Sequence, residues 1–393
     1  MICLERITIR EIHLALREPF ASAGGVVRHR RIALLRLHDR SGATAWSECV
    51  APERPTYTAE TIDTAWLAIR DWLAPLLLGR AVDGPDVVGA LLDASVRGHN
   101  MAKAALEMGC WALAAELRGV SLATLIGGTR DSVPTGIALG LVDDPALLAE
   151  RARAAVAEGY GRIKVKIEPG RDVAPLRLLR ETLGPSIGLM ADANATYRLD
   201  DAEHLAALDS LGLLMIEQPL AADDLVGHAA LAARIATPIC LDESIDSVTR
   251  AEHAVRLGSA RVLNVKPGRL GGFVAARAVH DVCVAAHIPV WCGGMLETGI
   301  GRAYNVALAS LPGFTLPGDL SPSARYWTCD VVDPAWTMDA AGMVRVPRAR
   351  AGLGVVVDER FIDDLTVRTE TLLAPSAAVV PAVARPHNAK SLE

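Results

Sequence analysis

Short apolar runs alternate with amphipathic stretches from residue 133 to residue 318, and the runs recur at a steady interval. Runs that are apolar at successive positions predict strands buried on both faces, as in a parallel sheet. The eight runs are 133–140, 162–167, 187–192, 213–217, 238–242, 261–266, 289–293 and 315–318. The helical stretches between them are 145–157, 172–182, 199–211, 225–236, 248–257, 272–287 and 298–311. The pattern predicts an α/β protein with a (β/α)₈-type barrel, a modified TIM barrel. An open sheet is the alternative, because the helix after the last run is weak.

The first hundred residues or so follow a different pattern. Residues 7–16 and 31–38 form strand-like runs, and a turn leads into a third run at 43–50. These runs predict a small antiparallel sheet. Helical periodicity follows over 58–96 and again over 101–117. The N-terminal part is therefore predicted to be an α+β unit.

These patterns divide the chain into three parts. We predict an α+β capping domain over residues 1–125 and the barrel over 126–325. Residues 326–393 are predicted to return to the cap and complete it, with a strand at 355–357 making the connection. The Pro- and Ala-rich tail from Pro375 is predicted to be loosely held.

Composition changes this picture little. The chain has 393 residues, of which 51% are hydrophobic and 22% are charged, as in an ordinary globular protein. Its net charge of -6 gives no support for nucleic-acid binding. No apolar run approaches the roughly 18 residues of a membrane helix, and the N-terminus lacks the apolar core of a signal peptide. We therefore expect neither a nucleic-acid partner nor a membrane partner.

Seven cysteines are scattered along the chain without any C-x-x-C pair. An odd number without metal-binding spacing argues against a zinc cluster and favours reduced thiols. We therefore expect a cytoplasmic protein.

Two lysines stand two positions apart in the second apolar run. Because side chains alternate faces along a strand, Lys164 and Lys166 point the same way. Two ammonium groups on a buried face are costly, and each is expected to make the other easier to deprotonate. A lone K-x-K is usually a solvated strand face, but a base near neutral pH arises in this way. We interpret Lys166 as that base.

Three carboxylates follow at equal intervals at the ends of the next three runs. Asp192, Glu217 and Asp242 are each one βα unit apart, so they fall at equivalent heights on adjacent strands. A single acidic residue at a strand end is more often a helix cap. Three together would repel one another unless a hard divalent cation binds them, and Mg²⁺ fits best, with Mn²⁺ also suitable. Asn194 and Glu243 lie close behind and are expected to support this site.

A further lysine ends the sixth run. Strands two and six face each other across a barrel of eight, so Lys166 and Lys266 would flank a substrate from opposite sides. Such a pair can remove a proton from one face of a carbon and return it to the other. Lys164 would stabilise the negative charge on a substrate carboxylate as it becomes an enediolate.

Two other features lie beside this pair. Arg269 either holds the surroundings of Lys266 positive and lowers its pKa or forms a structural ion pair, and the residues alone do not decide. The loop from Gly293 to Met295 offers backbone N–H groups that could receive a substrate carboxylate.

Long stretches of the chain resemble the enolase superfamily. The resemblance extends to its muconate-lactonizing-enzyme-like subgroup, and within it to the N-acylamino acid racemase / o-succinylbenzoate synthase family. The matching motifs are RIKVKIEPG (162–170), LLMIEQPL (213–220), TPICLDESI (237–245), NVKPGRLGG (264–272), IPVWCGGMLETGIGRA (288–303) and NVALASLPGFTLPGD (305–319).

The resemblance implies a Mg²⁺ site formed by Asp192, Glu217 and Asp242. It implies Lys166 and Lys266 as the acid/base pair, with Lys164 assisting. It also implies two reactions through one kind of intermediate. One racemises N-acylated, especially N-succinylated, amino acids. The other is the syn-dehydration that yields o-succinylbenzoate in menaquinone synthesis. In the racemising branch an arginine at the position of Arg269 accompanies the lysine.

The chain departs from the family pattern in the loop at 20–25, which contains Phe20 and Ser22 but has Gly24 where an aromatic would cover the substrate. We expect this loop to bear on substrate choice. The end of the eighth run lacks the D-x-D that dipeptide epimerases use, which argues against a dipeptide substrate. The expected partner is a small-molecule carboxylate, and a homo-oligomer is expected.

Overall fold

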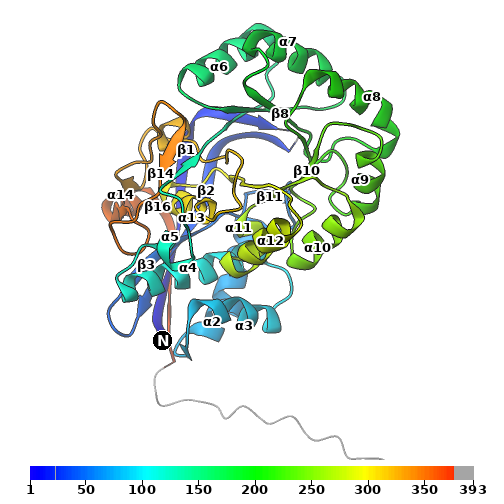
Figure 1. Ribbon diagram of the computed structural model, residues 1–393. Coiled ribbons are helices and arrows are strands. Elements are labelled where there is room, and N and C mark those ends of the chain that lie inside the picture. Colours follow the sequence, from blue (N-terminus) through cyan, green and yellow to red (C-terminus); the bar gives the residue numbers. More distant parts are fainter. Residues whose placement is uncertain (23, 376–393) are drawn as a thin grey trace, which may run out of the picture.

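A parallel sheet lies at the centre of the computed structural model, which describes residues 1–22 and 24–375 (Figure 1). Seven strands follow the order β12-β11-β10-β9-β8-β7-β6. They are β6 (Ile137–Leu139), β7 (Arg162–Lys166), β8 (Gly188–Asp192), β9 (Ile216–Glu217), β10 (Ile239–Leu241), β11 (Val262–Val265) and β12 (Val290–Cys292). Each βα unit adds one strand beside the last, which confirms the parallel arrangement predicted from the alternating pattern.

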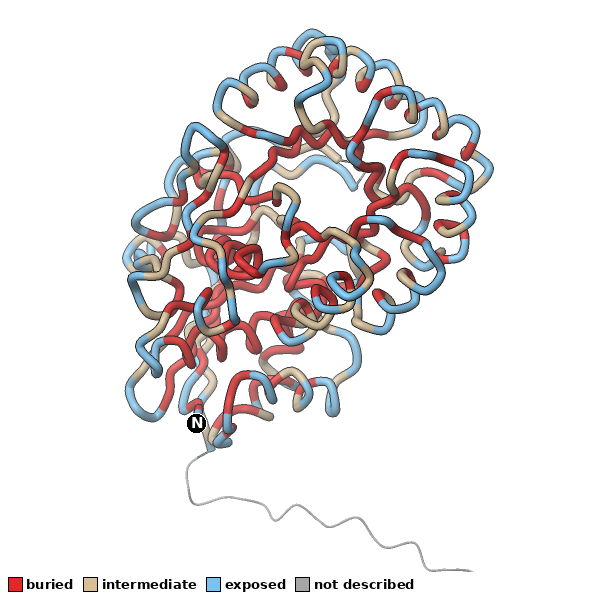
Figure 2. The backbone as a smooth tube through the Cα atoms, in the orientation of Figure 1, coloured by how far each residue is buried: buried red, intermediate tan, exposed pale blue. Residues whose placement is uncertain are grey.

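Helices form an arc outside this sheet (Figure 1). They are α6 (Pro145–Ala157), α7 (Val173–Leu183), α8 (Ala202–Ala206), α9 (Leu225–Ala232), α10 (Val248–Leu257), α11 (Pro267–Leu270), α12 (Phe273–Ala285) and α13 (Gly299–Ala309). The strands are largely buried, as are α11 and α13, whereas the outer faces of the other helices are exposed (Figure 2). Within the described residues, no helix is long and apolar enough to cross a membrane.

The eighth run does not form a strand. Gly318 forms an isolated bridge with Thr135 on one side, and Phe314, just before the run, forms one with Val290 on the other. Pro317 interrupts this segment, and proline has no N–H to donate to a ladder. The predicted eighth strand is therefore wrong in detail, although the segment lies where that strand would close the ring.

The capping unit contains an antiparallel sheet in the order β16-β1-β2-β3, with β4 paired to β1. Its strands are β1 (Ile2–Ser22), β2 (Gly25–Asp39), β3 (Thr44–Cys49), β4 (Ala81–Val82) and β16 (Thr366–Leu373). Its helices are α1 (Ile62–Ala68), α2 (Ala74–Leu77), α3 (Val88–Ser95) and α4 (Asn100–Arg118). Helix α4 is buried over most of its length, and Gly119 ends it in the left-handed conformation that glycine favours.

The strand that returns to the cap is not the one predicted. Strand β15 (Val356–Val357) pairs with β13 (Val332–Asp333), whereas β16 pairs antiparallel with β1. The sequence signal was misleading because β16 is a largely exposed edge strand with polar residues at most positions. Smaller elements complete this part: α5 (Leu122–Leu125), β5 (Ser132–Pro134), β14 (Met343–Arg345) and α14 (Glu359–Leu365). The predictions for Ala23 and for the tail from residue 376 lie outside the described residues.

The hairpin of β1 and β2 extends over the barrel (Figure 1). The Leu141 N–H donates to the Ala21 carbonyl at 3.0 Å, and the Arg17 N–H donates to the Tyr326 carbonyl at 2.9 Å. The cap therefore lies against the segments that follow the barrel strands, where polar side chains gather.

Candidate active site

Strand register brings three of the predicted site residues side by side. Lys166, Asp192 and Glu217 are register partners on β7, β8 and β9. Asp242 directly follows β10, and Lys266 directly follows β11. Parallel strands end at one edge of a sheet, so the predicted lysines and carboxylates meet there.

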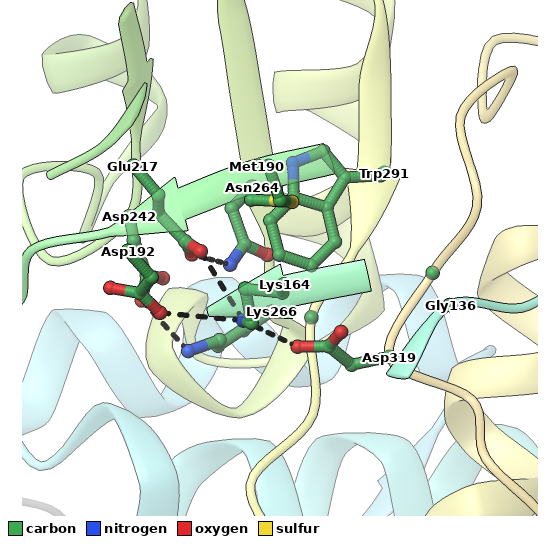
Figure 3. A network of polar contacts seen from close by, with 12 residues as sticks. Gly136, Lys164, Met190, Asp192, Glu217, Asp242, Asn264, Lys266, Trp291 and Asp319 are labelled. Carbon is green, nitrogen blue, oxygen red and sulfur yellow. Dashed lines mark hydrogen bonds and ion pairs between the residues drawn. The ribbon is translucent and has the colours of Figure 1, made fainter. Parts of the chain in front are cut away.

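Lys164 lies at the centre of the polar cluster in Figure 3. Its Nζ is 2.6 Å from Asp319 Oδ2, 3.2 Å from Glu217 Oε2 and 3.4 Å from Asp192 Oδ2. Burial lowers the pKa of Lys164, but these three carboxylates outweigh it and hold the pKa above its usual range. The prediction that neighbouring cations make this lysine easier to deprotonate is therefore wrong, because its nearest charges are carboxylates.

Lys166 contacts residues of the next strand end. Its Nζ donates to Asp192 Oδ2 and to Asn194 Oδ1, both at 2.6 Å. Asn194 Nδ2 in turn donates to Glu243 Oε1 at 3.0 Å. Asn194 therefore orients Lys166 and joins it to Glu243. Burial, followed by the charges of Asp242 and Asp192, raises the pKa of Glu243 to about 7.

Lys266 lies against Asp242 and Tyr57. Its Nζ is 2.8 Å from Asp242 Oδ2 and 4.4 Å from the centre of the Tyr57 ring. Burial lowers the pKa of Lys266, but Asp242 and then Tyr57 raise it, and the net pKa lies well above its usual value. Arg269 lowers the pKa of Lys266, as the first of the two alternatives for Arg269 predicts. The opposite effect of Asp242 on this pKa is larger.

Arg269 is also part of a buried ion pair, as the other alternative predicts. Its guanidinium contacts Asp242 Oδ1, donates to the Tyr57 hydroxyl at 2.7 Å and donates to the Ile245 carbonyl at 2.6 Å. The Tyr57 hydroxyl donates to Asp242 Oδ1 at 2.9 Å. Tyr57 therefore brings a cap residue into contact with the ends of two barrel strands.

A cavity of about 80 Å³ opens between the lysines. It is lined by Phe20, Ala138, Lys164, Lys166, Asp192, Lys266, Gly294, Leu296, Asp319 and Tyr326. Phe20 therefore lines this cavity, whereas Ser22 does not, and the substrate-binding roles expected for these two residues stay predictions. A second cavity of about 170 Å³ shares Lys166 and is otherwise lined mostly by apolar residues.

The loop after β12 was predicted to offer backbone N–H groups to a substrate carboxylate. This prediction is wrong for the N–H groups of Gly293 and Met295. The Gly293 N–H donates to the Val265 carbonyl at 3.3 Å, and the Met295 N–H donates to Glu297 Oε1 at 2.7 Å. Neither N–H is therefore open to a substrate carboxylate. A Cβ at Gly293 would come within 2.5 Å of Lys266 Cε, so glycine leaves room for the lysine.

Both parts of the chain match known family models. Residues 147–361 match the "Enolase C-terminal domain-like" model, and residues 5–127 match "Mandelate racemase / muconate lactonizing enzyme, N-terminal domain". The chain belongs to the enolase superfamily. Enzymes of this superfamily remove a proton from the carbon next to a carboxylate.

Superfamily relatives cover almost the whole chain. An N-succinylamino acid racemase from Amycolatopsis sp is 47% identical over 365 residues, covering 92% of this chain and 97% of that protein. An o-succinylbenzoate synthase from Bacillus subtilis (strain 168) is 46% identical over 374 residues, covering 94% and 100%. A crystal structure of an enolase superfamily member from Listeria innocua has a TM-score of 0.92 at 36% identity, covering 95% and 100%.

The donor set of the superfamily site suits a hard divalent cation. Glu217 Oε2 is buried and accepts no hydrogen bond, although it forms an ion pair with Lys164. Burial together with the charges of Asp192 and Asp242 raises the pKa of Glu217 to about 8. In residues 1–22 and 24–375, no three acidic, His or Cys side chains converge closely enough to hold a metal in this conformation. The metal assignment therefore stays a prediction.

Several residues of the site were not predicted from the sequence. Gln218 Oε1 accepts from the N–H of Asp242 at 3.0 Å, and Asn264 Nδ2 donates to Glu217 Oε1 at 2.6 Å. Gln218 lies at a strand end and Asn264 lies within a strand, so the same pattern that found the carboxylates could have included them. Tyr57 follows no strand of the barrel, and no local signal marks it.

Proposed function

We propose that this enzyme abstracts the proton α to a carboxylate, with Mg²⁺ as cofactor, and racemises N-acyl and especially N-succinyl amino acids through an enediolate. The observation that carries the proposal is the placement of Lys166 and Lys266. Lys166 is the last residue of β7, and Lys266 directly follows β11. Three strands of the sheet lie between β7 and β11, yet both lysines line one cavity. Two bases on opposite sides of one carbon are what inversion requires.

The lysines divide the reaction by face. In one direction, neutral Lys166 accepts the α-proton at its Nζ, and the Lys266 ammonium returns a proton to the opposite face of the same carbon. The roles exchange in the reverse direction. Lys164 keeps its proton and donates toward the oxyanion that develops on the substrate carboxylate. When bound, Mg²⁺ held by Asp192, Glu217 and Asp242 would supply further stabilisation of that charge.

Arg269 supports the racemase assignment. Its guanidinium is buried and contacts the Asp242 carboxylate, which also pairs with Lys266. Competition for that carboxylate draws negative charge away from the lysine and favours its neutral form. Such help matters most when Lys266 must act as a base, as racemisation requires in one of its two directions.

A second candidate is o-succinylbenzoate synthase as the main role, with a place in menaquinone synthesis. It rests on the relatives of that name, one of which is 46% identical over 374 residues. Only one lysine need act as a base in that dehydration, so Lys266 would serve as a fixed cation. The two activities can coexist in one site, because both pass through an enediolate.

The test is exchange of the α-proton. Each enantiomer of N-succinylphenylalanine is incubated with the Mg²⁺-loaded enzyme in D₂O, and loss of the α-proton signal and inversion of the centre are followed by NMR and chiral chromatography. We expect exchange and inversion with both enantiomers. The synthase would remain as the function if no N-acyl amino acid, succinyl and acetyl forms included, showed exchange while the enzyme dehydrated the cyclohexadiene carboxylate that is the precursor of o-succinylbenzoate. The cytoplasmic location and the homo-oligomer expected from the sequence stay predictions.

A further inference from the structure

A carboxylate of the cap holds the first turn of a barrel helix. Glu107, on α4, is fully buried, and its Oε2 accepts from the Phe273 N–H at 2.9 Å. Its Oε1 accepts from the Val274 N–H and from Trp111 Nε1, both at 3.0 Å. Phe273 and Val274 begin α12, so Glu107 satisfies amide groups that have no partner within their own helix.

The local sequence of α12 provides no such cap. Gly272 precedes the helix, and its side-chain-free backbone adopts a φ of 129°, which favours glycine. A Cβ at Gly272 would lie 2.2 Å from Glu107 Oε2, so the close approach of α4 requires glycine there. The helix therefore takes its N-terminal cap from the other domain.

A second residue of α4 holds the segment just before that helix. Asn100 Nδ2 donates to the Arg269 carbonyl at 2.9 Å and to the Asp246 carbonyl at 3.0 Å. Asn100 and Glu107 lie two turns apart, so they share one face of α4. Together they hold the chain on both sides of Gly271 and Gly272, in the segment that begins with Lys266.

Lys166 has no comparable support from the cap. Its side-chain hydrogen bonds within the described residues go to Asp192 and Asn194, both at the end of β8. The two catalytic lysines therefore depend on different parts of the fold. Lys266 depends on the packing of α4 against the barrel, whereas Lys166 depends on the neighbouring strand.

We propose that Glu107 is a positioning residue that sets the reach of Lys266, with Asn100 as its weaker partner. The inference rests on the proposed function, since it concerns one of the two proton-transfer faces. It predicts that loosening this contact slows proton transfer on the Lys266 face alone. Racemisation rates cannot reveal this, because an equilibrium constant of one forces kcat/KM to be equal in both directions.

The experiment uses the full-length Mg²⁺-loaded enzyme in D₂O. For each enantiomer of N-succinylphenylalanine, it measures exchange of the α-proton for deuterium with retention of configuration. Lys266→Ala first identifies the enantiomer whose exchange depends on Lys266. Glu107→Gln keeps the shape of the side chain but replaces one acceptor by a donor facing a backbone N–H. We expect exchange of the Lys266-dependent enantiomer to fall on the order of tenfold relative to the other. Asn100→Ala should lower the same ratio, the exchange rate of the Lys266-dependent enantiomer divided by that of the other enantiomer, by a smaller factor.

Glu48→Gln is the matched control. Glu48, on β3, is another buried cap carboxylate. It accepts from the N–H of Thr298, which precedes α13, and from the N–H of Gly301 in α13, and this helix carries neither lysine. Glu48→Gln should leave the ratio unchanged. An unchanged ratio in folded Glu107→Gln and Asn100→Ala, or an equal shift in Glu48→Gln, overturns the inference; if Glu107→Gln does not fold, Asn100→Ala decides. Absence of exchange with the unsubstituted enzyme would instead count against the proposed function.

Discussion

Lys164 and Asp319 form a buried ion pair that joins β7 to the segment closing the barrel beyond β6. The Lys164 Nζ lies 2.6 Å from Asp319 Oδ2 (Figure 3). The Arg162 Nη2 lies 2.8 Å from Asp319 Oδ1. A Cβ at Gly136 would come within 2.3 Å of Arg162 Nε, so glycine lets the arginine reach across. One carboxylate thus compensates two cations, and it fixes the ammonium that faces the cavity.

Asp319→Asn should therefore cost both stability and activity. Removing the carboxylate takes away the ion-pair partner of the buried Arg162 and leaves Lys164 with the longer contacts to Glu217 and Asp192. Loss of one partner of a buried pair costs about 3–5 kcal/mol. Urea denaturation measures the change in the free energy of unfolding. Asp131→Asn is the control, because the Asp131 side chain is 91% exposed and pairs with Arg348 at the surface. It should cost no more than about 1 kcal/mol. Equal costs at both positions would contradict the role of the buried pair.

Replacing either catalytic lysine should stop proton exchange on one face of the α-carbon. Lys166→Ala should abolish exchange from one enantiomer of N-succinylphenylalanine, and Lys266→Ala should abolish it from the other. The loss should be about 10²–10⁴-fold, the usual contribution of a positioned base. Exchange into each enantiomer in D₂O is followed by NMR. Equal loss with both enantiomers in each single variant would refute the assignment of one lysine to each face.

Mg²⁺ should stabilise the folded protein as well as support its activity. Binding to Asp192, Glu217 and Asp242 would relieve their mutual repulsion, and saturation at 100 times the dissociation constant adds about 2.7 kcal/mol. The melting temperature of EDTA-treated enzyme should rise on addition of Mg²⁺, and Asp131→Asn should keep this rise. Glu217→Gln should lose it. An equal rise in Glu217→Gln would place the metal elsewhere.

Glu48 should make stability fall as the pH rises. Burial, opposed by hydrogen bonds from Thr298, raises the pKa of Glu48 to about 8 from an ordinary value of 4.5. Between pH 4.5 and about pH 8, the folded state keeps a proton that the unfolded chain has released. The stabilisation that this proton provides is therefore complete below pH 4.5 and is lost as the pH rises toward about 8. The free energy of unfolding should therefore decline relative to Glu48→Gln, by up to about 1.4 kcal/mol per pH unit.

Urea denaturation at about pH 5 and about pH 8 measures that difference. Glu203→Gln, on the exposed part of α8, controls for the loss of one carboxylate from the net charge. A difference between the enzyme and Glu48→Gln that does not change with pH would contradict the burial argument.

The sequence by itself determined the repeating βα architecture and the residues at its strand ends. Continuous apolar runs report burial on both faces, and the equal spacing of Asp192, Glu217 and Asp242 follows from one strand per unit. These are local properties, because period and spacing depend only on neighbouring positions along the chain. The K-x-K motif and Lys266 were found in the same way.

Only the tertiary structure decided which charges meet and which domain supports them. Asp319 raises the pKa of Lys164, which is opposite to the direction expected from the sequence. The two side chains meet because the barrel closes, and their spacing along the chain does not show this. Tyr57 and Glu107 reach the barrel from the cap, and β16 rather than 355–357 completes the cap sheet. Contacts between residues far apart in the chain arise from packing, and no local pattern carries them.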